Sequence, residues 1–213
     1  MQKEDITQVT EIDQEAFPIQ WPPTNYHHEL QNQLAHYIVA CEEREMVEVP
    51  EVKTSPEKGF SELSSRVRQL FSYNRFFGNN EVRQPSKEYV AGFAGIWIMA
   101  DEAHIINLAV RGNHRRQGIG ELLLISIMDL ATELNTRIVT LEVRASNLAA
   151  QSLYHKYGFA QVGLRQGYYT DNKENAVLMS AESITSAPFQ LQLNRLKQAH
   201  SKRWGIPLYQ IAR

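Results

Sequence analysis

Apolar residues recur along this chain with two spacings, and each spacing predicts a kind of element. An interval of three or four residues, typical of an amphipathic helix, runs through residues 5–17, 120–135 and 147–157. Runs rich in β-branched and aromatic residues, typical of strands, cover residues 36–41, 89–100, 104–110, 138–143, 159–164 and 175–179. A short helix is expected from a cap at Thr24 to about Leu34, and a tight turn over residues 101–103. This order predicts a mixed α/β domain around a sheet.

Three regions of the chain depart from this regular pattern: a strand that contains glycines, an irregular internal segment and a C-terminal tail. The glycines of residues 89–100 indicate a bulge or a close approach of two backbones. Residues 42–88 carry nine acidic residues, eight basic residues and three prolines, so we expect an insertion that is partly helical, over residues 64–77, and partly mobile. Residues 183–213 follow the domain, residues 1–182, as a C-terminal tail with five basic and no acidic residues. Its apolar residues favour a docked helix with a solvated basic face over an RNA-binding arm.

Composition narrows the classes of protein to which the chain can belong. The formal net charge is −2, which argues against nucleic acid or an anionic membrane as the main partner. The polar N-terminus does not resemble a signal peptide, and the longest apolar run, AGFAGIWIMA, is too short to cross a bilayer. Cys41 is the one cysteine, so no internal disulfide can form, as suits a reducing compartment. We therefore expect a cytoplasmic protein.

The first candidate site lies where a predicted strand gives way to a long helix. Two glycines there allow a ligand to approach the backbone, and the unpaired N–H groups and positive dipole of the helix start favour a pyrophosphate. A flexible basic cap is the alternative. A dinucleotide-binding turn is rejected, because Leu123 replaces its third glycine and a five-residue loop separates strand from helix. The segment consists of Arg115, Arg116, Gln117, Gly118, Ile119 and Gly120.

Two further groups carry possible proton chemistry. Glu142 lies inside an apolar strand, where it either pairs with an arginine such as Arg144 or faces a polar cleft; partial burial would raise its pKa and make it a general base. The alternative is a strand residue that points at solvent, since Thr140, Glu142 and Arg144 share one face. Asn147 is placed to cap the next helix. On that helix the hydroxyl of Tyr154 can donate a proton, although packing against the sheet is the alternative and is favoured for Tyr157. The histidines lack the spacing of metal ligands, and no metal is expected.

Three stretches resemble one enzyme family. NLAVRGNHRRQGIGELLL, TLEVRASNLAAQSLYHKYGF and GLRQGYY are similar to the GNAT acetyltransferases, and most of all to the RimI branch, the ribosomal-protein alanine N-acetyltransferases. The resemblance implies the GNAT fold: a mixed, mostly antiparallel sheet flanked by helices, here with a long insertion between the second and third family strands. It also implies acetyl-CoA as co-substrate, and direct acetyl transfer to a protein N-terminus, that of a ribosomal protein.

The resemblance also implies a role for each matching residue. Leu108, Ala109 and Val110 would bind the pantetheine arm and thioester, and the segment 115–120 the pyrophosphate. Glu142 matches the general base, Tyr154 the general acid and Asn147 a cofactor contact. The residues expected near the acceptor are Arg144, Tyr168 and Tyr169.

The chain departs from the family in ways that keep other functions open. The family's first strand is missing or lies upstream of Met1, and the insertion could alter the choice of acceptor. Another N-terminus, a lysine or a small amine is therefore an alternative acceptor. An acyl-CoA-binding module without turnover is a further alternative, against which the intact Glu142 and Tyr154 count.

Overall fold

A computed structural model describes residues 1–17, 23–42, 89–205 and 209–212, and all structural statements concern these residues. They belong to one compact unit, which takes in Met1–Glu43 and Glu88–Arg213. The predicted insertion lies outside the described residues except for Glu42, and so does the helix predicted over residues 64–77. No helix within the described ranges is long and apolar enough to cross a membrane.

A seven-stranded sheet forms the centre of this unit, in the order β5-β6-β4-β3-β2-β1-β7. β3 and β4 run parallel, and every other described pair of neighbours is antiparallel. The prediction of a mixed, mostly antiparallel sheet is therefore confirmed. The strands are β1 (Ala35–Glu42), β2 (Tyr89–Met99), β3 (Glu102–Val110), β4 (Ile138–Arg144), β5 (Ala160–Arg165), β6 (Ala176–Glu182) and β7 (Tyr209–Ala212).

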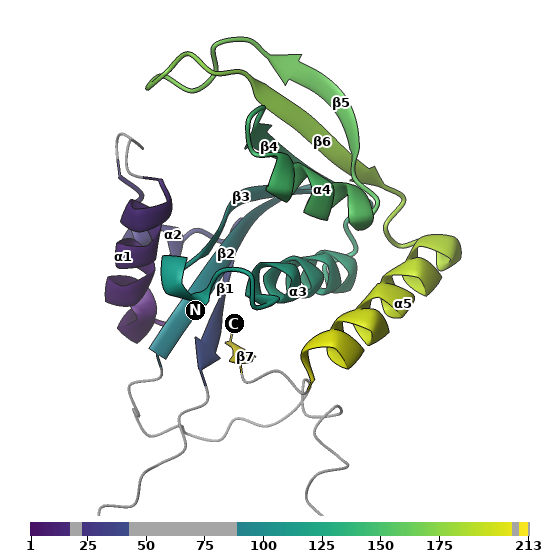
Figure 1. The fold of residues 1–213 in the computed structure, drawn as a ribbon, viewed down its shortest axis with the longest axis horizontal. Helices are drawn as coiled ribbons and strands as arrows, with labels where there is room; N and C mark the ends of the chain where they lie inside the picture. Colours follow the sequence, from purple (N-terminus) through teal and green to yellow (C-terminus); the bar gives the residue numbers. More distant parts are fainter. Residues whose placement is uncertain (18–22, 43–88, 206–208, 213) are drawn as a thin grey trace, which may run out of the picture. The chain divides into compact units, whose positions relative to one another are not determined.

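Helices cover both faces of the sheet, as Figure 1 shows. On one face, here the α1 face, Val9 and Ile12 of α1 pack with Tyr26 of α2 against alternate residues of β1 and β2. On the opposite α3 face, α3 and α4 cover the other set of strand residues. The helices are η1 (Lys3–Asp5), α1 (Ile6–Ala16), α2 (Tyr26–Glu29), η4 (Gly112–His114), α3 (Ile119–Glu133), α4 (Leu148–Lys156) and α5 (Ala187–Trp204).

The glycines of β2 mark two places where backbones or rings approach closely. The register between β2 and β3 shifts between Gly95 and Ile96, because Ile106 is an extra residue on β3. A Cβ on Gly95 would lie 2.4 Å from the Tyr37 ring, and one on Gly92 would lie 2.7 Å from the carbonyl oxygen of Ala109. The expected bulge and close approach are confirmed, since no side chain fits at either position.

Two local predictions were wrong in detail. The cap of α2 is Asn25, whose side chain accepts from the His28 N–H at 3.2 Å, and the helix ends at Glu29 rather than near Leu34. The β2–β3 turn is formed by Ala100 and Asp101, so β3 already begins at Glu102. Both differences concern single residues at the end of an element, which apolar spacing does not specify.

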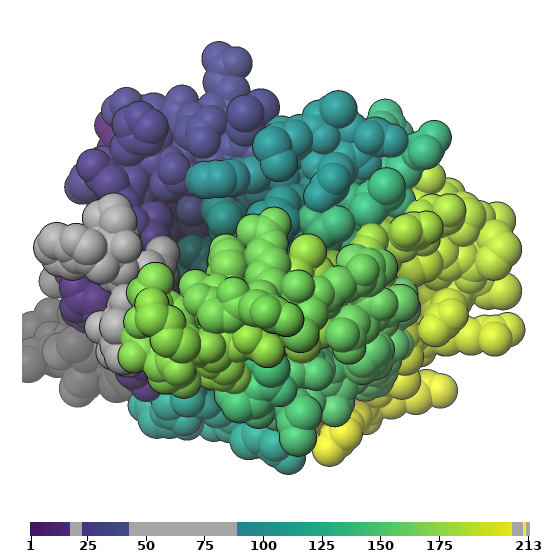
Figure 2. Space-filling model, turned by 90° about the horizontal axis from the view of Figure 1, so that it is seen from above, coloured from purple at the N-terminus to yellow at the C-terminus, as the bar shows by residue number. Residues whose placement is uncertain are grey.

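The C-terminal tail contains two elements of the unit. α5 packs along α3, and Leu193 on its inner side is 2% exposed within the core. This contact explains why the predicted helix of residues 120–135 is apolar around much of its circumference, since α5 covers a side that the sheet does not. Figure 2 shows α5 in yellow beside the green surface of α4 and the last strands. β7 was not predicted; it pairs with β1 and forms the sheet edge that the family resemblance left open.

Candidate active site

The parallel strands β3 and β4 separate towards their carboxyl ends. Their pairing runs from Glu102 opposite Ile138 to Ile105 opposite Leu141 and stops there. β3 continues to Val110 with β2 as its partner, whereas β4 continues with β6. One edge of residues 106–110 therefore has no strand partner among the described residues. Such an opening at the ends of adjacent parallel strands is where ligands bind in α/β sheets. The predicted cofactor residues Leu108, Ala109 and Val110 lie on this open edge.

The bulge at Ile106 changes which face each side chain of β3 meets. Ile105 and Leu108 pack on the α3 face, whereas Ile106 packs on the α1 face. Asn107 also lies on the α1 face, where its Nδ2 donates to the Tyr26 hydroxyl at 3.3 Å. Because a bulge leaves one residue outside the ladder, it presents backbone N–H and C=O groups to the gap at mid-strand. This place is suited to binding a polarised carbonyl oxygen.

Residues 115–120, here called the glycine loop, join β3 to α3 through an unusual backbone. Arg116 has φ +65° and Gly118, the N-cap of α3, has φ +82°. Gly118 has no side chain to cap the helix, so the N–H groups of its first turn stay available to an anion. Arg115 and Arg116 are exposed beside them, and Arg115 Nε donates to the Val110 carbonyl at 3.1 Å. Left-handed residues followed by free N–H groups form an anion-binding nest, so the loop fits a pyrophosphate.

Glu142 lies on the α1 face, beside the gap, and its side chain is 12% exposed. His104 Nε2 lies 2.9 Å from one carboxylate oxygen, and the Arg165 guanidinium lies 3.1 Å from the other. The hydrogen bond from His104 lowers the pKa of Glu142 and outweighs desolvation, and the charge of Arg165 lowers it further. The expectation of a raised pKa was therefore wrong, because burial comes with a hydrogen bond from His104 and the charge of Arg165. Glu142 is a carboxylate at neutral pH and can accept a proton.

His104 belongs to a chain of hydrogen bonds that crosses the two parallel strands. Its Nδ1 lies 2.8 Å from the Thr140 hydroxyl, and that hydroxyl donates to Glu102 at 2.6 Å. Since the Glu142 carboxylate can only accept, His104 Nε2 donates to it. The Thr140 hydroxyl holds the other ring nitrogen, so the orientation of the imidazole ring is fixed from both sides.

Tyr154 lies on the opposite face of the sheet from Glu142. Its side chain packs on the α3 face, its ring centroid is 5.6 Å from that of Phe159, and it is 8% exposed. Burial, followed by the charge of Tyr169, raises the pKa of Tyr154 to about 12. The hydroxyl has no hydrogen-bond partner among the described residues. It therefore keeps its proton at neutral pH and is available to a ligand in the gap.

Tyr157 has the packing role that the sequence favoured for it. It is 2% exposed, and its hydroxyl donates to Glu121 in the first turn of α3 at 2.7 Å. Asn147 caps α4, since its Oδ1 accepts from the Ala150 N–H at 3.1 Å. The capping role of Asn147 is thus confirmed, and its predicted contact with a cofactor stays a prediction.

Arg144 stabilises the loop that carries the two predicted acceptor tyrosines. Its guanidinium contacts Asp171 at 3.0 Å and Glu174 at 3.2 Å, and it stacks on Tyr169 with 3.9 Å to the ring centroid. Burial raises the pKa of Tyr169 to about 12, and the charges of Glu142 and Glu174 contribute. Tyr168 lies next to it, is 44% exposed and has the Arg165 guanidinium over its ring. Arg144 is therefore occupied by this loop, and the arginine that pairs with Glu142 is Arg165 rather than Arg144.

Two residues of the site were missed in the sequence. His104 was set aside with the other histidines because it lacks metal-ligand spacing, and Arg165 was not singled out. A parallel alignment of residues 102–105 with 138–141 would have placed His104 beside Thr140 and Glu142, but the sequence does not reveal which strands are neighbours. Among the described residues, no group of three or more His, Cys, Asp or Glu side chains is arranged to bind a metal ion.

The chain is similar in sequence to proteins of one family. The sequence model of a family described as "Acetyltransferase (GNAT) family" matches residues 50–159. A Bacillus subtilis (strain 168) protein, provisionally named a ribosomal protein bS18-alanine N-acetyltransferase, is 33% identical over 180 residues, which cover 84% of this chain and 90% of that protein.

Two matches to Escherichia coli proteins are shorter. The ribosomal protein bS18-alanine N-acetyltransferase of strain K12 is 40% identical over 93 residues, 43% of this chain and 63% of that protein. The crystal structure of the ribosomal-protein-S18-alanine N-acetyltransferase from Escherichia coli is 37% identical, covers 46% of this chain and 65% of the other, and has a TM-score of 0.43.

Proposed function

This chain belongs to the GNAT family of acetyltransferases, and we propose that it transfers the acetyl group of acetyl-CoA to the N-terminal alanine of a small-subunit ribosomal protein. The resemblance drawn from its motifs is confirmed by the matches. The acceptor is proposed from the names of two relatives, one of them provisional, which give ribosomal protein bS18 as the substrate. The observation that carries the proposal is the gap between β3 and β4, with Glu142 on one face of the sheet and Tyr154 on the other.

Acetyl-CoA supplies an acetyl group already activated as a thioester. The open edge of Leu108, Ala109 and Val110 binds the pantetheine arm through backbone groups, in place of the missing strand partner. The glycine loop binds the pyrophosphate with the free N–H groups of the first turn of α3, and Arg115 and Arg116 add positive charge. A backbone N–H at the Ile106 bulge stabilises the developing oxyanion.

Glu142 acts as the base on the acceptor side of the sheet. Its carboxylate is ionised, and through a water molecule it takes a proton from the α-ammonium group of the acceptor. His104 and Arg165 orient the carboxylate from two directions. Their charges also make Glu142 a weaker base than an isolated glutamate. The arrangement therefore favours positioning over basicity as the contribution of Glu142.

Tyr154 acts as the acid on the thiol side. Its pKa of about 12 keeps the hydroxyl protonated until a thiolate leaves, and no other described group competes for that proton. The acceptor peptide lies on the α1 face, beside Tyr168 and Tyr169, whose loop is stabilised by Arg144. We propose that the reaction takes place in the cytoplasm, where ribosomal proteins are made, and that residues 1–182 supply the chemistry.

A thiol-release assay tests this function directly. The protein is incubated with acetyl-CoA and a peptide that begins with alanine, and separately with the same peptide after its N-terminus is blocked and a lysine is added. Release with the alanine peptide alone, and its loss in Glu142→Gln, supports the proposal. Release only with lysine or a small amine would mean that one of these, and not an N-terminal alanine, is the acceptor. Calorimetric binding of acetyl-CoA with no release for any amine would indicate a binding module.

A further inference from the structure

We propose that the C-terminal helix α5 fixes the glycine loop in its ligand-binding conformation, through His200 and Trp204. This proposal deepens the proposed function, on which it rests. Both residues lie outside residues 50–159, the part that matches the family. Both contact Gly118, the left-handed N-cap residue at the centre of the loop.

The first contact sets the direction of a peptide group. His200 is 7% exposed, and its Nε2 lies 3.0 Å from the carbonyl oxygen of Gly118. A carbonyl oxygen only accepts, so Nε2 carries the proton and donates. The same oxygen accepts the N–H of Leu122 at 2.9 Å, so two donors hold it towards the protein. Because the peptide unit is planar and trans, the N–H of Ile119 points opposite to this carbonyl. Holding the Gly118 oxygen towards α5 therefore aims the Ile119 N–H outward, into the anion site.

The second contact fills the side of Gly118 where other residues carry a side chain. A Cβ built there would lie 2.7 Å from both Cε2 and Nε1 of Trp204, so the indole ring packs directly on the glycine. The Nε1 of Trp204 is buried and has no hydrogen-bond partner among the described residues. A buried donor without a partner is unfavourable, so packing rather than hydrogen bonding explains the position of the ring.

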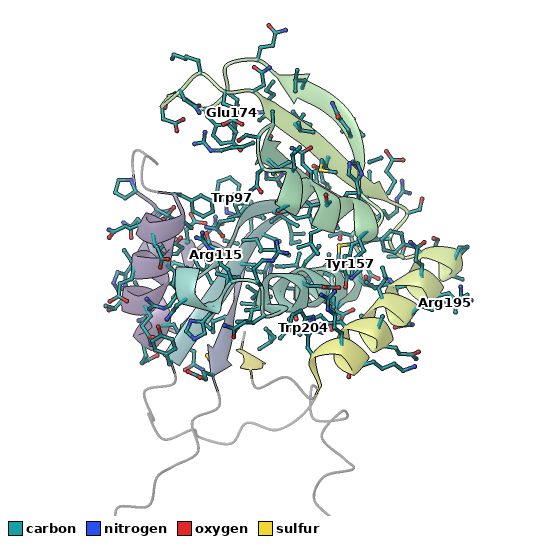
Figure 3. The ribbon with its side chains drawn as sticks, in the orientation of Figure 1. Trp97, Arg115, Tyr157, Glu174, Arg195 and Trp204 are labelled. Carbon is teal, nitrogen blue, oxygen red and sulfur yellow. The ribbon has the colours of Figure 1, made fainter. Side chains whose placement is uncertain are left out.

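The rest of α5 is anchored firmly enough to act as a support. Leu193 is buried in the core, Lys197 pairs with Asp129 of α3, and Gln190 donates to the Ile184 carbonyl at 2.7 Å. After α5, the chain pairs with β1 through β7. In Figure 3 Trp204 lies near α3, whereas Arg195 of the same helix lies on its outer side. The last turn of α5 is thus held from both directions.

The consequence is an effect on cofactor affinity more than on chemistry. A loop already held in its bound conformation loses less entropy when it binds, so removing the support should weaken acetyl-CoA binding. His200 and Trp204 do not contact Glu142 or Tyr154 in any described interaction, so turnover at saturating acetyl-CoA should change little. The residues are positioning residues for the pyrophosphate site.

Four variants test the proposal. His200→Ala removes the donor, His200→Gln keeps an N–H that can reach the same oxygen, and Trp204→Ala removes the ring. Arg195→Ala, on the exposed side of α5, is the matched control. Calorimetry with acetyl-CoA should show Kd raised about tenfold in His200→Ala and Trp204→Ala, as expected for the loss of one buried contact. His200→Gln should recover part of the affinity, and Arg195→Ala should bind like the wild type.

Hydrogen exchange of the free protein supplies a readout that does not depend on activity. The amide of Leu122, which donates to the Gly118 carbonyl, should exchange faster in His200→Ala, while those of the central strands stay unchanged. Equal acetyl-CoA affinity in His200→Ala, Trp204→Ala and wild type would overturn the proposal, and so would uniformly faster exchange throughout the protein. If His200→Ala does not fold, His200→Gln and Trp204→Phe carry the same comparison. Failure of the wild type itself to bind acetyl-CoA would instead refute the proposed function.

Discussion

Tyr154 on α4 and Tyr157, the residue that caps the end of α4, offer a sharp test of the site because the structure gives them different surroundings. In Tyr154→Phe the ring keeps its packing against Phe159, and the hydroxyl that is lost has no partner among the described residues. The free energy of unfolding should therefore change by less than about 0.5 kcal/mol. Turnover should fall by roughly 10²–10⁴-fold, as expected when a general acid is removed.

For Tyr157→Phe we expect the opposite result, a loss of stability with turnover largely kept. The hydroxyl that is lost donates to the Glu121 carboxylate at 2.7 Å in a buried setting. A hydrogen bond to a charged group contributes about 1.5–3 kcal/mol. Lys156 still pairs with Glu121 after the substitution, so we expect the lower half of that range. For a chain of this size the melting temperature should fall by roughly 4–8 °C, with turnover largely kept.

The assays are urea denaturation, a thermal melt and thiol release at saturating acetyl-CoA, applied to both variants. Calorimetry with acetyl-CoA completes the comparison, because loss of an acid should leave the Kd unchanged. A Tyr154→Phe enzyme with wild-type turnover would refute the acid assignment. A Tyr154→Phe enzyme that loses turnover and affinity equally would indicate that the residue acts by packing.

Two further predictions concern pH. In His104→Ala, Glu142 loses the hydrogen bond that does most to lower its pKa, so the pKa of Glu142 should rise. The acid limb of the pH profile of kcat/KM should then move to higher pH. An acid limb that does not move would show that His104 does not influence the base. Glu174 has a pKa lowered from 4.5 to about 2 by hydrogen bonds from Ser146 and then from Asn172 and Arg144. Because this pKa is depressed in the folded state, the Glu174 carboxylate contributes stability above about pH 4.5 that is lost as the pH falls through about 2. Urea denaturation should therefore show a lower free energy of unfolding for Glu174→Gln than for the wild type near neutral pH, and the difference should shrink as the pH is lowered from about 4.5 to about 2. A deficit independent of pH would contradict this origin.

Local sequence predicted most of the elements because their causes are local. The apolar spacing of residues 120–135 and the β-branched run of residues 138–143 led to α3 and β4 within a residue or two at each end. Gly118 was singled out because glycine lets a ligand approach the backbone, and the structure adds that its φ of +82° is open to glycine and costly for most other residues. The cap at Asn147 follows the same logic, because a capping side chain acts within three residues of itself.

The electrostatics of Glu142 could not be read from its own strand. Partial burial pointed to a raised pKa, but His104 and Arg165 reach the carboxylate from β3 and β5, which lie 38 and 23 residues away in the sequence. Their arrangement depends on strand order and on the register of β3 against β4. A pKa reflects all the charges within a few ångströms, so its direction follows from tertiary structure and not from the residue's neighbours in the chain.

The sequence by itself therefore determined the order of elements, the glycine loop and the identity of the acid and base candidates, since each rests on periodicity or a short motif. Only the tertiary structure decided that β3 and β4 part beyond Ile105, that Glu142 and Tyr154 lie on opposite faces of the sheet, and that α5 contacts Gly118. The physical reason is the range of the interactions. Backbone propensity and capping act between near neighbours, whereas strand pairing, helix docking and charge pairing join residues that come together only when the chain folds.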